Sequence, residues 1–158
     1  MADATSSKEF AVTKLSRLEV LMSPSASADP LKAMGMMAYS TPTTESANPE
    51  LRGSASGYSR VVVNGVPIYN PVRNQQLDGI GNFSLFNADI VGEQYVYPSN
   101  PPLEYGNATG GIVNIRTTQA LPEGQRTRLS ASLASIGAFH GFKIGTKSFV
   151  QTYANLQS

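Results

Sequence analysis

A tight β-hairpin is the feature of the sequence that most constrains the fold. Asn64-Gly65 stands between the apolar runs Ser59–Val63 and Val66–Tyr69. Both residues of the dipeptide tolerate the positive φ angles of a two-residue type I′ turn, so the two runs are expected to pair as antiparallel strands. Pro67 cannot donate a backbone hydrogen bond, which predicts that the second strand lies at a sheet edge or near its own start.

The segment around Asp29 carries the signals of a helix start. Asp29 can accept hydrogen bonds from the N–H groups of a first helical turn, and Pro30 at the first helical position sacrifices no bond. A helix is therefore predicted from Pro30 to the region of 35–37. Strands are predicted at 10–21, 90–97 and 112–117, a loop at 70–82, and a short helical turn at 84–87.

The C-terminal part of the chain has a different pattern. After Gly124 small and apolar residues alternate, and from Ser148 to Ser158 the more apolar side chains stand at even positions. This length and this period of two are typical of a strand of an outer-membrane barrel. Periodicity alone, however, favours an ordinary half-buried strand of a soluble protein.

Composition excludes several function classes. The 158 residues suffice for one domain with a substantial core, and 12 Lys and Arg residues balance 11 Asp and Glu, so the chain lacks the positive surface that nucleic acid requires. There is no Cys and only one His, His140, which leaves no thiolate and too few imidazoles for most metal sites or acid–base catalysis. No metal, cofactor or nucleic-acid partner is expected. No apolar run approaches the roughly 20 residues of a membrane-spanning helix.

The segment Gly53–Gly57 carries two serines between glycines and resembles the nucleophile turn of serine hydrolases. That turn must lead from a strand into a helix, whereas a hairpin strand follows here, and His140 has no evident acid to orient it. A flexible loop is favoured over a hydrolase with Ser56 as nucleophile.

The order of the motifs is more informative than any one of them. Along the chain come Asp29-Pro30-Leu31-Lys32-Ala33, Leu51-Arg52-Gly53, the hairpin Arg60–Ile68, the glycine-rich Tyr105–Ile115 with the letters YGNATGGIVNI, and the alternating residues 128–158. Over residues 10–158 this series resembles the plug domain of TonB-dependent outer-membrane receptors, followed by the start of their barrel.

The resemblance implies an α/β (α+β) fold, with a small mixed β-sheet, short helices and long loops. Residues 1–9 are expected to be a disordered lead, 10–122 the plug, and 125–158 the first two strands of a barrel of about 22 strands. The chain is too short to contain that barrel, which would be its main partner. The unpaired edges of the 125–158 strands favour self-association of the fragment.

The resemblance also implies a function that needs no catalytic residue. A plug occludes the barrel in the Gram-negative outer membrane, with its N-terminus facing the periplasm, and takes part in ligand binding and energy-coupled import. The implied partners are the TonB C-terminal domain and a nutrient such as a siderophore, cobalamin or an oligosaccharide; the fragment itself is expected to be soluble. The alternative is a free-standing soluble ligand-binding or adhesive module.

The resemblance also implies candidate site residues, which are found from the positions of the family's motifs in this sequence. The apical loops of the plug would form a ligand surface of hydroxyl and amide groups for polar, weakly charged ligands. Arg52 is expected to contact the barrel, and five glycines are expected to serve backbone geometry. The expected ligand-binding residues are Thr43, Thr44, Glu45, Ser54, Ser56, Tyr58, Tyr69, Asn70 and Arg73, and the glycines are Gly53, Gly65, Gly106, Gly110 and Gly111.

Overall fold

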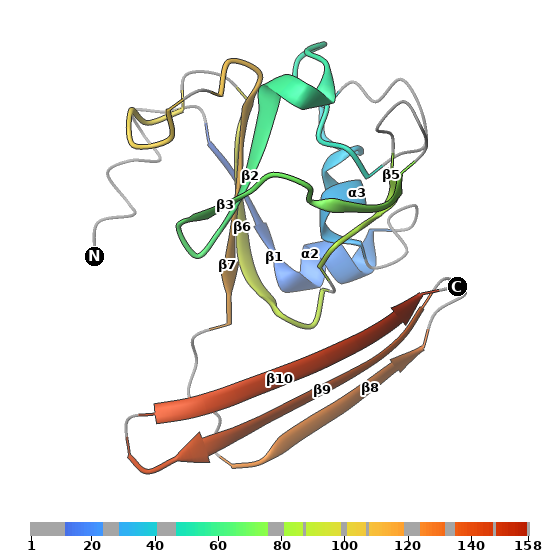
Figure 1. The fold of residues 1–158 in the computed structure, drawn as a ribbon, viewed down its shortest axis with the longest axis vertical. Helices are drawn as coiled ribbons and strands as arrows, with labels where there is room; N and C mark the ends of the chain where they lie inside the picture. Colours follow the sequence, from blue (N-terminus) through green and yellow to red (C-terminus); the bar gives the residue numbers. More distant parts are fainter. Residues whose placement is uncertain are drawn as a thin grey trace. The chain divides into compact units, whose positions relative to one another are not determined.

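The computed structural model divides the chain into two compact units, Met1–Thr117 and Thr118–Ser158, each built around β-strands (Figure 1). The residues that the structure describes are 12–23, 29–40, 47–75, 81–86, 88–98, 101–106, 108–118, 124–131, 135–146 and 148–157.

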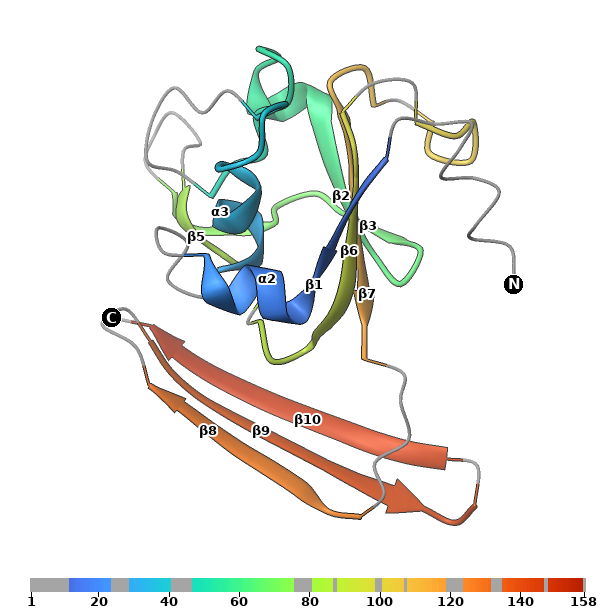
Figure 2. The same ribbon diagram turned by 180° about the vertical axis from the view of Figure 1, so that it is seen from behind.

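The first unit contains a five-stranded mixed sheet in the order β1-β6-β7-β2-β3. Strands β2 and β7 are parallel, and every other neighbouring pair is antiparallel. Helices α2 and α3 lie on one side of this sheet in both views (Figures 1 and 2). The small mixed sheet with short helices confirms the expected fold class. The strands are β1 (Thr13–Ser16), β2 (Ser59–Val63), β3 (Val66–Ile68), β6 (Val91–Tyr97) and β7 (Gly111–Thr117).

Both faces of the central strands are covered by apolar side chains. The larger core cluster lies on the helix side and includes Val113 and Ile115 of β7. A second cluster on the other face contains Tyr95, Tyr97 and Ile112, with Tyr105 packed against it. Strand β7 is therefore buried on both sides from Gly111 to Ile115, and Asn114 is the one polar residue among these five.

The Asn64-Gly65 hairpin is confirmed. Asn64 has a φ of 49° and Gly65 a φ of 85°, as a type I′ turn requires. Val62 pairs with Pro67, and β3 forms one edge of the sheet, so the missing N–H of Pro67 interrupts no ladder.

Helix α3 (Pro30–Met34) begins where the sequence predicted. The Asp29 carboxylate accepts hydrogen bonds from the N–H groups of Leu31 (2.9 Å) and Lys32 (3.1 Å). Its other oxygen accepts one from the N–H of Ser84 (2.6 Å). The same side chain therefore caps the helix and joins it to a distant strand.

The strand predicted at 10–21 is right for Thr13–Ser16 and wrong for residues 17–21, and residues 10–11 lie outside the described residues. Helix α2 (Arg17–Met22) starts from a capping box, in which Ser16 and Glu19 exchange side-chain to backbone hydrogen bonds. The Ser-x-x-Glu spacing that produces this box is visible in the sequence, and it outweighs the imperfect alternation of apolar residues.

A second, two-stranded sheet occupies the region predicted as a loop at 70–82 and a helical turn at 84–87. Strand β4 (Val72–Gln75) pairs antiparallel with β5 (Gly81–Ser84), and both predictions are wrong over these strands. The short hairpin is stable because α3 and the 47–48 segment hold it: Asn48 accepts a hydrogen bond from the N–H of Gly81 at 2.7 Å.

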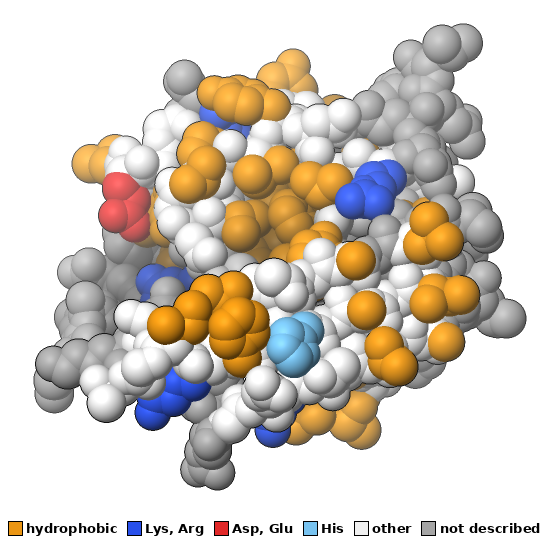
Figure 3. All heavy atoms as spheres, turned by 60° about the horizontal axis from the view of Figure 1, so that its bottom comes forward, with side chains coloured by type: hydrophobic (Ala, Val, Ile, Leu, Met, Phe, Trp, Pro, Cys, Tyr) orange, Lys and Arg blue, Asp and Glu red, His pale blue; other side chains and the backbone are white. Residues whose placement is uncertain are grey.

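The second unit is a three-stranded antiparallel sheet of β8 (Arg126–Ala131), β9 (Ser135–Ile144) and β10 (Ser148–Gln157). Two strands were expected in this segment. The clean alternation of β10 is present as exposed Val150, Ala154 and Leu156 on one face, with half-buried Gln151 and Tyr153 on the other. In Figure 3 the single histidine of the chain, in pale blue, lies among orange apolar side chains.

Candidate functional site

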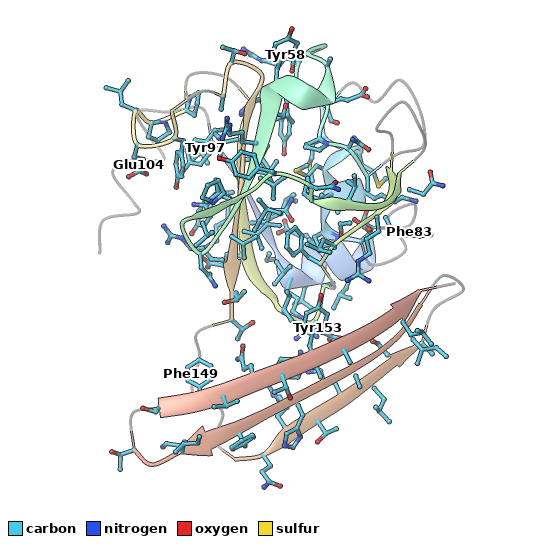
Figure 4. The ribbon with its side chains drawn as sticks, viewed as in Figure 1. Tyr58, Phe83, Tyr97, Glu104, Phe149 and Tyr153 are labelled. Carbon is cyan, nitrogen blue, oxygen red and sulfur yellow. The ribbon has the colours of Figure 1, made fainter. Side chains whose placement is uncertain are left out.

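The loop from Leu51 to Tyr58 lies at the N-terminal ends of the parallel strands β2 and β7. Tyr58 ends the 3-10 helix η1 (Ser56–Tyr58) and immediately precedes β2, and its side chain is 61% exposed. Its carbonyl accepts a hydrogen bond from the N–H of Gly110 at 2.9 Å. Figure 4 shows Tyr58 beyond this end of β2. The Tyr58 ring is thus presented outward from a loop that is tied to the strand beside it.

Two adjacent glycines allow this close approach. A Cβ atom added to Gly110 would lie 2.5 Å from Ser54 Oγ and 2.9 Å from the carbonyl carbon of Tyr58. A Cβ added to Gly111 would lie 2.6 Å from Leu51 Cδ1, and its φ of 129° disfavours other residues. The hydroxyl of Ser54 is held in the same contact, because it donates to Leu51 O at 2.7 Å.

Tyr69 lies beside the same half of β2. It directly follows Ile68, which pairs with Val61, and its ring is 85% exposed. The Arg60 guanidinium carbon lies 5.5 Å from the centroid of the Tyr69 ring, within the range of a cation–π contact. Arg60 was not among the predicted ligand-binding residues. Its position two residues after Tyr58 on a hairpin strand was the signal that could have identified it.

Arg73 belongs to a different part of the unit. It lies on β4, opposite Phe83 of β5, and Lys32 of α3 lies 4.8 Å from the Phe83 ring centroid. Phe83 and Tyr58 lie far apart in Figure 4. The predicted ligand residues therefore divide into one group around Tyr58 and Tyr69 and a second one at the β4–β5 hairpin.

The remaining predicted residues are placed as follows. Thr43, Thr44 and Glu45 lie outside the described residues, as does the side chain of Ser56. Asn70 is exposed beside Tyr69. Arg52 is exposed with a φ of 51°, and its N–H donates to Tyr39 O at 2.8 Å. Gly53 and Gly65 have positive φ, whereas a Cβ at Gly106 would meet nothing within 4 Å.

The edge strand β1 is held to β6 by a charged and aromatic cluster. Lys14 Nζ lies 2.5 Å from a Glu93 carboxylate oxygen, and the Tyr95 hydroxyl donates to the other oxygen at 2.7 Å. Lys14 and Arg116 both lie near the Tyr95 ring, at 5.6 and 5.1 Å from its centroid. The hydrogen bond from Lys14 lowers the pKa of Glu93, and the bond to Glu93 raises the pKa of Lys14.

The aromatic cluster that includes Tyr97 also contains a partly buried polar contact of Tyr105. The Tyr105 ring lies 6.0 Å from the Tyr97 ring, and its hydroxyl accepts a hydrogen bond from Asn114 Nδ2 at 2.8 Å. Burial is the main cause that raises the pKa of Tyr105 to about 12. This hydroxyl stays protonated at neutral pH and serves packing rather than proton transfer.

The described residues offer no catalytic constellation. Among them no group of three His, Cys, Asp or Glu side chains could hold a metal ion. The Gly53–Gly57 segment has Ala55 at its centre, where a nucleophile turn needs its serine, and β2 rather than a helix follows it. His140 lies in the other unit, where its Nδ1 is 2.9 Å from Thr127 Oγ1. Within the described part of the chain, no helix is long and apolar enough to span a membrane.

Comparison with known proteins points in one direction. The family model described as the TonB-dependent receptor plug domain matches residues 5–112. Among solved structures, the ferric enterobactin receptor PfeA of Pseudomonas aeruginosa, crystallised as a double mutant, is similar at 21% identity and a TM-score of 0.63. The likeness covers 91% of this chain and 24% of that receptor, so the chain spans about a quarter of its length. No curated protein matches the chain.

The receptor structure supports the fold, and the family match covers more than two thirds of the chain. The first three motifs of the series and most of Tyr105–Ile115 fall within the matched residues, and the alternating residues 128–158 follow them, so the resemblance to the plug is confirmed. The chain belongs to the TonB-dependent receptor plug domain family.

Proposed function

We propose that this chain is the plug of an outer-membrane active transporter, which occludes its own barrel, takes part in binding a nutrient and releases it when TonB acts. The observation that carries the proposal is the plug-family match over 5–112, followed along the chain by a three-stranded antiparallel sheet with one exposed apolar face. Sheets of this pattern are typical of outer-membrane barrels.

The geometry of the first unit supports a ligand surface at the Tyr58 end of β2. Tyr58, Tyr69 and Arg60 offer two exposed rings and a guanidinium, and Ser54 lies in the loop that precedes β2. Aromatic rings with a few hydrogen-bonding groups suit a polar ligand that also has flat or apolar parts, such as a siderophore, cobalamin or an oligosaccharide.

The first unit also contains an edge strand, β1, that a pulling force on the preceding chain could displace. Strand β1 is a four-residue edge strand near the N-terminus, and it pairs only with β6 within the described residues. A pull on the preceding chain by the TonB C-terminal domain would load this strand first. The Lys14–Glu93 contact then sets part of the resistance to its release.

Occlusion can be tested without knowing the ligand. In the full-length protein that contains this chain, deletion of residues 12–117 should convert a closed barrel into an open pore. Planar-bilayer conductance should rise, and cells should become sensitive to a large antibiotic that the outer membrane normally excludes. The variant Leu103→Ala, which changes a fully exposed loop residue, serves as the control and should remain closed.

The outcomes are distinct. An outer-membrane protein whose deletion variant conducts no better than the intact protein would show that the unit does not occlude a barrel. A protein that is absent from the outer membrane would instead favour the free-standing ligand-binding module.

A further inference from the structure

The Asn64-Gly65 turn brings together a side chain and a backbone nitrogen that can react with each other. Asn64 is the only Asn of the chain that is followed by Gly. Because Gly has no Cβ, its backbone nitrogen is the least hindered one that can approach the amide of a preceding Asn. Both residues are exposed, and a Cβ added to Gly65 would meet no described atom within 4 Å. The turn is therefore a chemically labile pair at the surface of the first unit.

The reaction open to this pair is deamidation through a cyclic imide. The Gly65 backbone nitrogen, once a base has removed its proton, attacks Asn64 Cγ and forms a new N–Cγ bond. The Cγ–Nδ2 bond then breaks, and Nδ2 leaves as ammonia after it has taken a proton from solvent. Water next opens the imide at either carbonyl, which leaves aspartate or isoaspartate at position 64.

Thr117, the last residue of β7, holds the amide that has to react. Asn64 Nδ2 donates to Thr117 Oγ1 at 2.9 Å, and Asn64 Oδ1 accepts from the Thr117 N–H at 3.0 Å. The Asn64 N–H donates to Ile115 O at 3.0 Å, so the backbone of the turn is tied to the same strand. A nucleophile must reach its carbon at a defined distance and direction. Because Cγ lies between Oδ1 and Nδ2, it cannot turn toward the Gly65 nitrogen while both bonds to Thr117 persist.

We propose that Asn64 is a site of spontaneous deamidation that Thr117 keeps latent in the folded chain. The reaction is slow while the two hydrogen bonds hold the amide, and it proceeds whenever the β2–β3 hairpin separates from the end of β7. Because ammonia is lost, the product accumulates with the time that this contact has spent open. The inference goes beyond transport and depends only on contacts inside the first unit.

The two products have different effects on the hairpin. Aspartate keeps an oxygen that can accept from the Thr117 N–H. Isoaspartate carries one additional carbon in the backbone, which a two-residue turn cannot accommodate without loss of the pairing between Val63 and Val66. Formation of isoaspartate should therefore loosen β3, the strand that leads directly to the exposed Tyr69 ring.

Peptide mass mapping of the full-length protein measures the reaction at this one position. Trypsin cleaves after Arg60 and Arg73 and releases residues 61–73, which contain Asn64 and Asn70. Asn70 precedes a proline, whose backbone nitrogen has no proton to lose, so Asn70 cannot form the imide. The mass gain of an amide-to-acid change in this peptide therefore reports Asn64 alone.

The folded protein should gain the acid slowly in mildly alkaline buffer, and the same protein kept unfolded in denaturant should gain it many-fold faster. Thr117→Val removes the Oγ1 acceptor and should raise the rate in the folded protein several-fold. Thr117→Ser keeps the hydroxyl and should react at the rate of the unsubstituted protein. Gly110→Ala, which introduces its collision at Ser54 and Tyr58 rather than at the turn, is the matched control and should leave the rate unchanged.

Several results would overturn the proposal. Equal rates in the folded and unfolded protein would show that Thr117 gives no protection, as would an unchanged rate in Thr117→Val. An equal rise in Thr117→Val and Gly110→Ala would assign the reaction to a general loss of stability. A peptide 61–73 that gains no mass even in denaturant would show that the Asn64-Gly65 pair is not reactive.

Discussion

The N–H of Gly110 donates a hydrogen bond to the carbonyl oxygen of Tyr58, and this 2.9 Å contact joins the Leu51–Tyr58 loop to the start of β7. The Ser54 hydroxyl lies in the same contact, 3.5 Å from Gly110 O. The loop that carries the exposed Tyr58 ring therefore has its position set by a glycine that comes more than fifty residues later.

Gly110→Ala should destabilise the chain by about 1–3 kcal/mol, because the new methyl group would collide with Ser54 Oγ and with the backbone of Tyr58. The midpoint of urea unfolding measures this loss. Gly106→Ala is the matched control: its methyl group meets nothing within 4 Å, and its effect should stay within about 0.5 kcal/mol. Equal midpoints for the two variants would show that the loop can shift away from β7.

Asp29→Ala should lower the free energy of unfolding by about 2–4 kcal/mol, because it removes the cap of α3 and leaves the buried N–H of Ser84 without an acceptor. Asp29→Asn keeps one acceptor oxygen and should lose less. Ser16→Ala, at the exposed cap of α2, should cost only about 1 kcal/mol. The ranking of the three urea midpoints is the test, and an Asp29→Ala midpoint no lower than that of Ser16→Ala would contradict it.

The Lys14–Glu93 pair should make the stability of β1 depend on pH. The hydrogen bond from Lys14, followed by that from Tyr95, holds the pKa of Glu93 below its usual 4.5. The charged form is therefore favoured by folding, and its contribution is present above pH 4.5 and lost as the pH falls through the folded-state pKa.

The difference in unfolding midpoint between the natural chain and Glu93→Gln should accordingly be present at neutral pH and shrink below about pH 4.5. Hydrogen exchange of the β1 amides should follow the same trend. Lys14→Gln removes the partner and should abolish most of the pH-dependent difference. A difference that grows on acidification would mean that the pair opposes folding.

Asn64→Ala should cost about 1–2 kcal/mol, because Asn64 Nδ2 donates to Thr117 Oγ1, Oδ1 accepts from the Thr117 N–H, and alanine is disfavoured at a φ of 49°. Asn64→Asp keeps the acceptor and the tolerance of positive φ, so it should cost less. Thermal unfolding of the two variants distinguishes the effects. Equal losses of stability in Asn64→Ala and Asn64→Asp would show that loss of the Nδ2 donor accounts for the whole effect.

Replacement of the exposed rings should weaken ligand binding without unfolding the domain. Tyr58→Ala and Tyr69→Ala should each reduce energy-dependent uptake of the imported nutrient by the full-length receptor, assayed with a panel of ferric siderophores, cobalamin and oligosaccharides. Leu103→Ala, which changes a fully exposed residue on another loop, should have no effect. Arg73→Ala tests the second group: uptake should fall only if the β4–β5 hairpin also contacts the ligand.

Local patterns account for the parts of the fold that the sequence predicted correctly. The Asn64-Gly65 turn, the Asp29-Pro30 helix start and the strand at 112–117 depend on backbone preferences and capping groups within a few residues. The errors at residues 17–21 and at β4–β5 have two different causes. The first error overlooked a capping box that can be recognised in the sequence. The second concerned a short hairpin whose strand β5 is held by hydrogen bonds to Asp29 and Asn48, which lie far away in the sequence.

The order of motifs along the chain identified the family, because that order is a property of the sequence itself. It did not reveal that Arg60 lies beside Tyr69, that Arg73 belongs to a separate sheet, or that Asn64 binds Thr117. These relationships arise from strand pairing and register, which bring together residues on different strands. Tertiary structure alone decided them, since no local preference of Tyr58 specifies Gly110, or any other residue so far along the chain, as its partner.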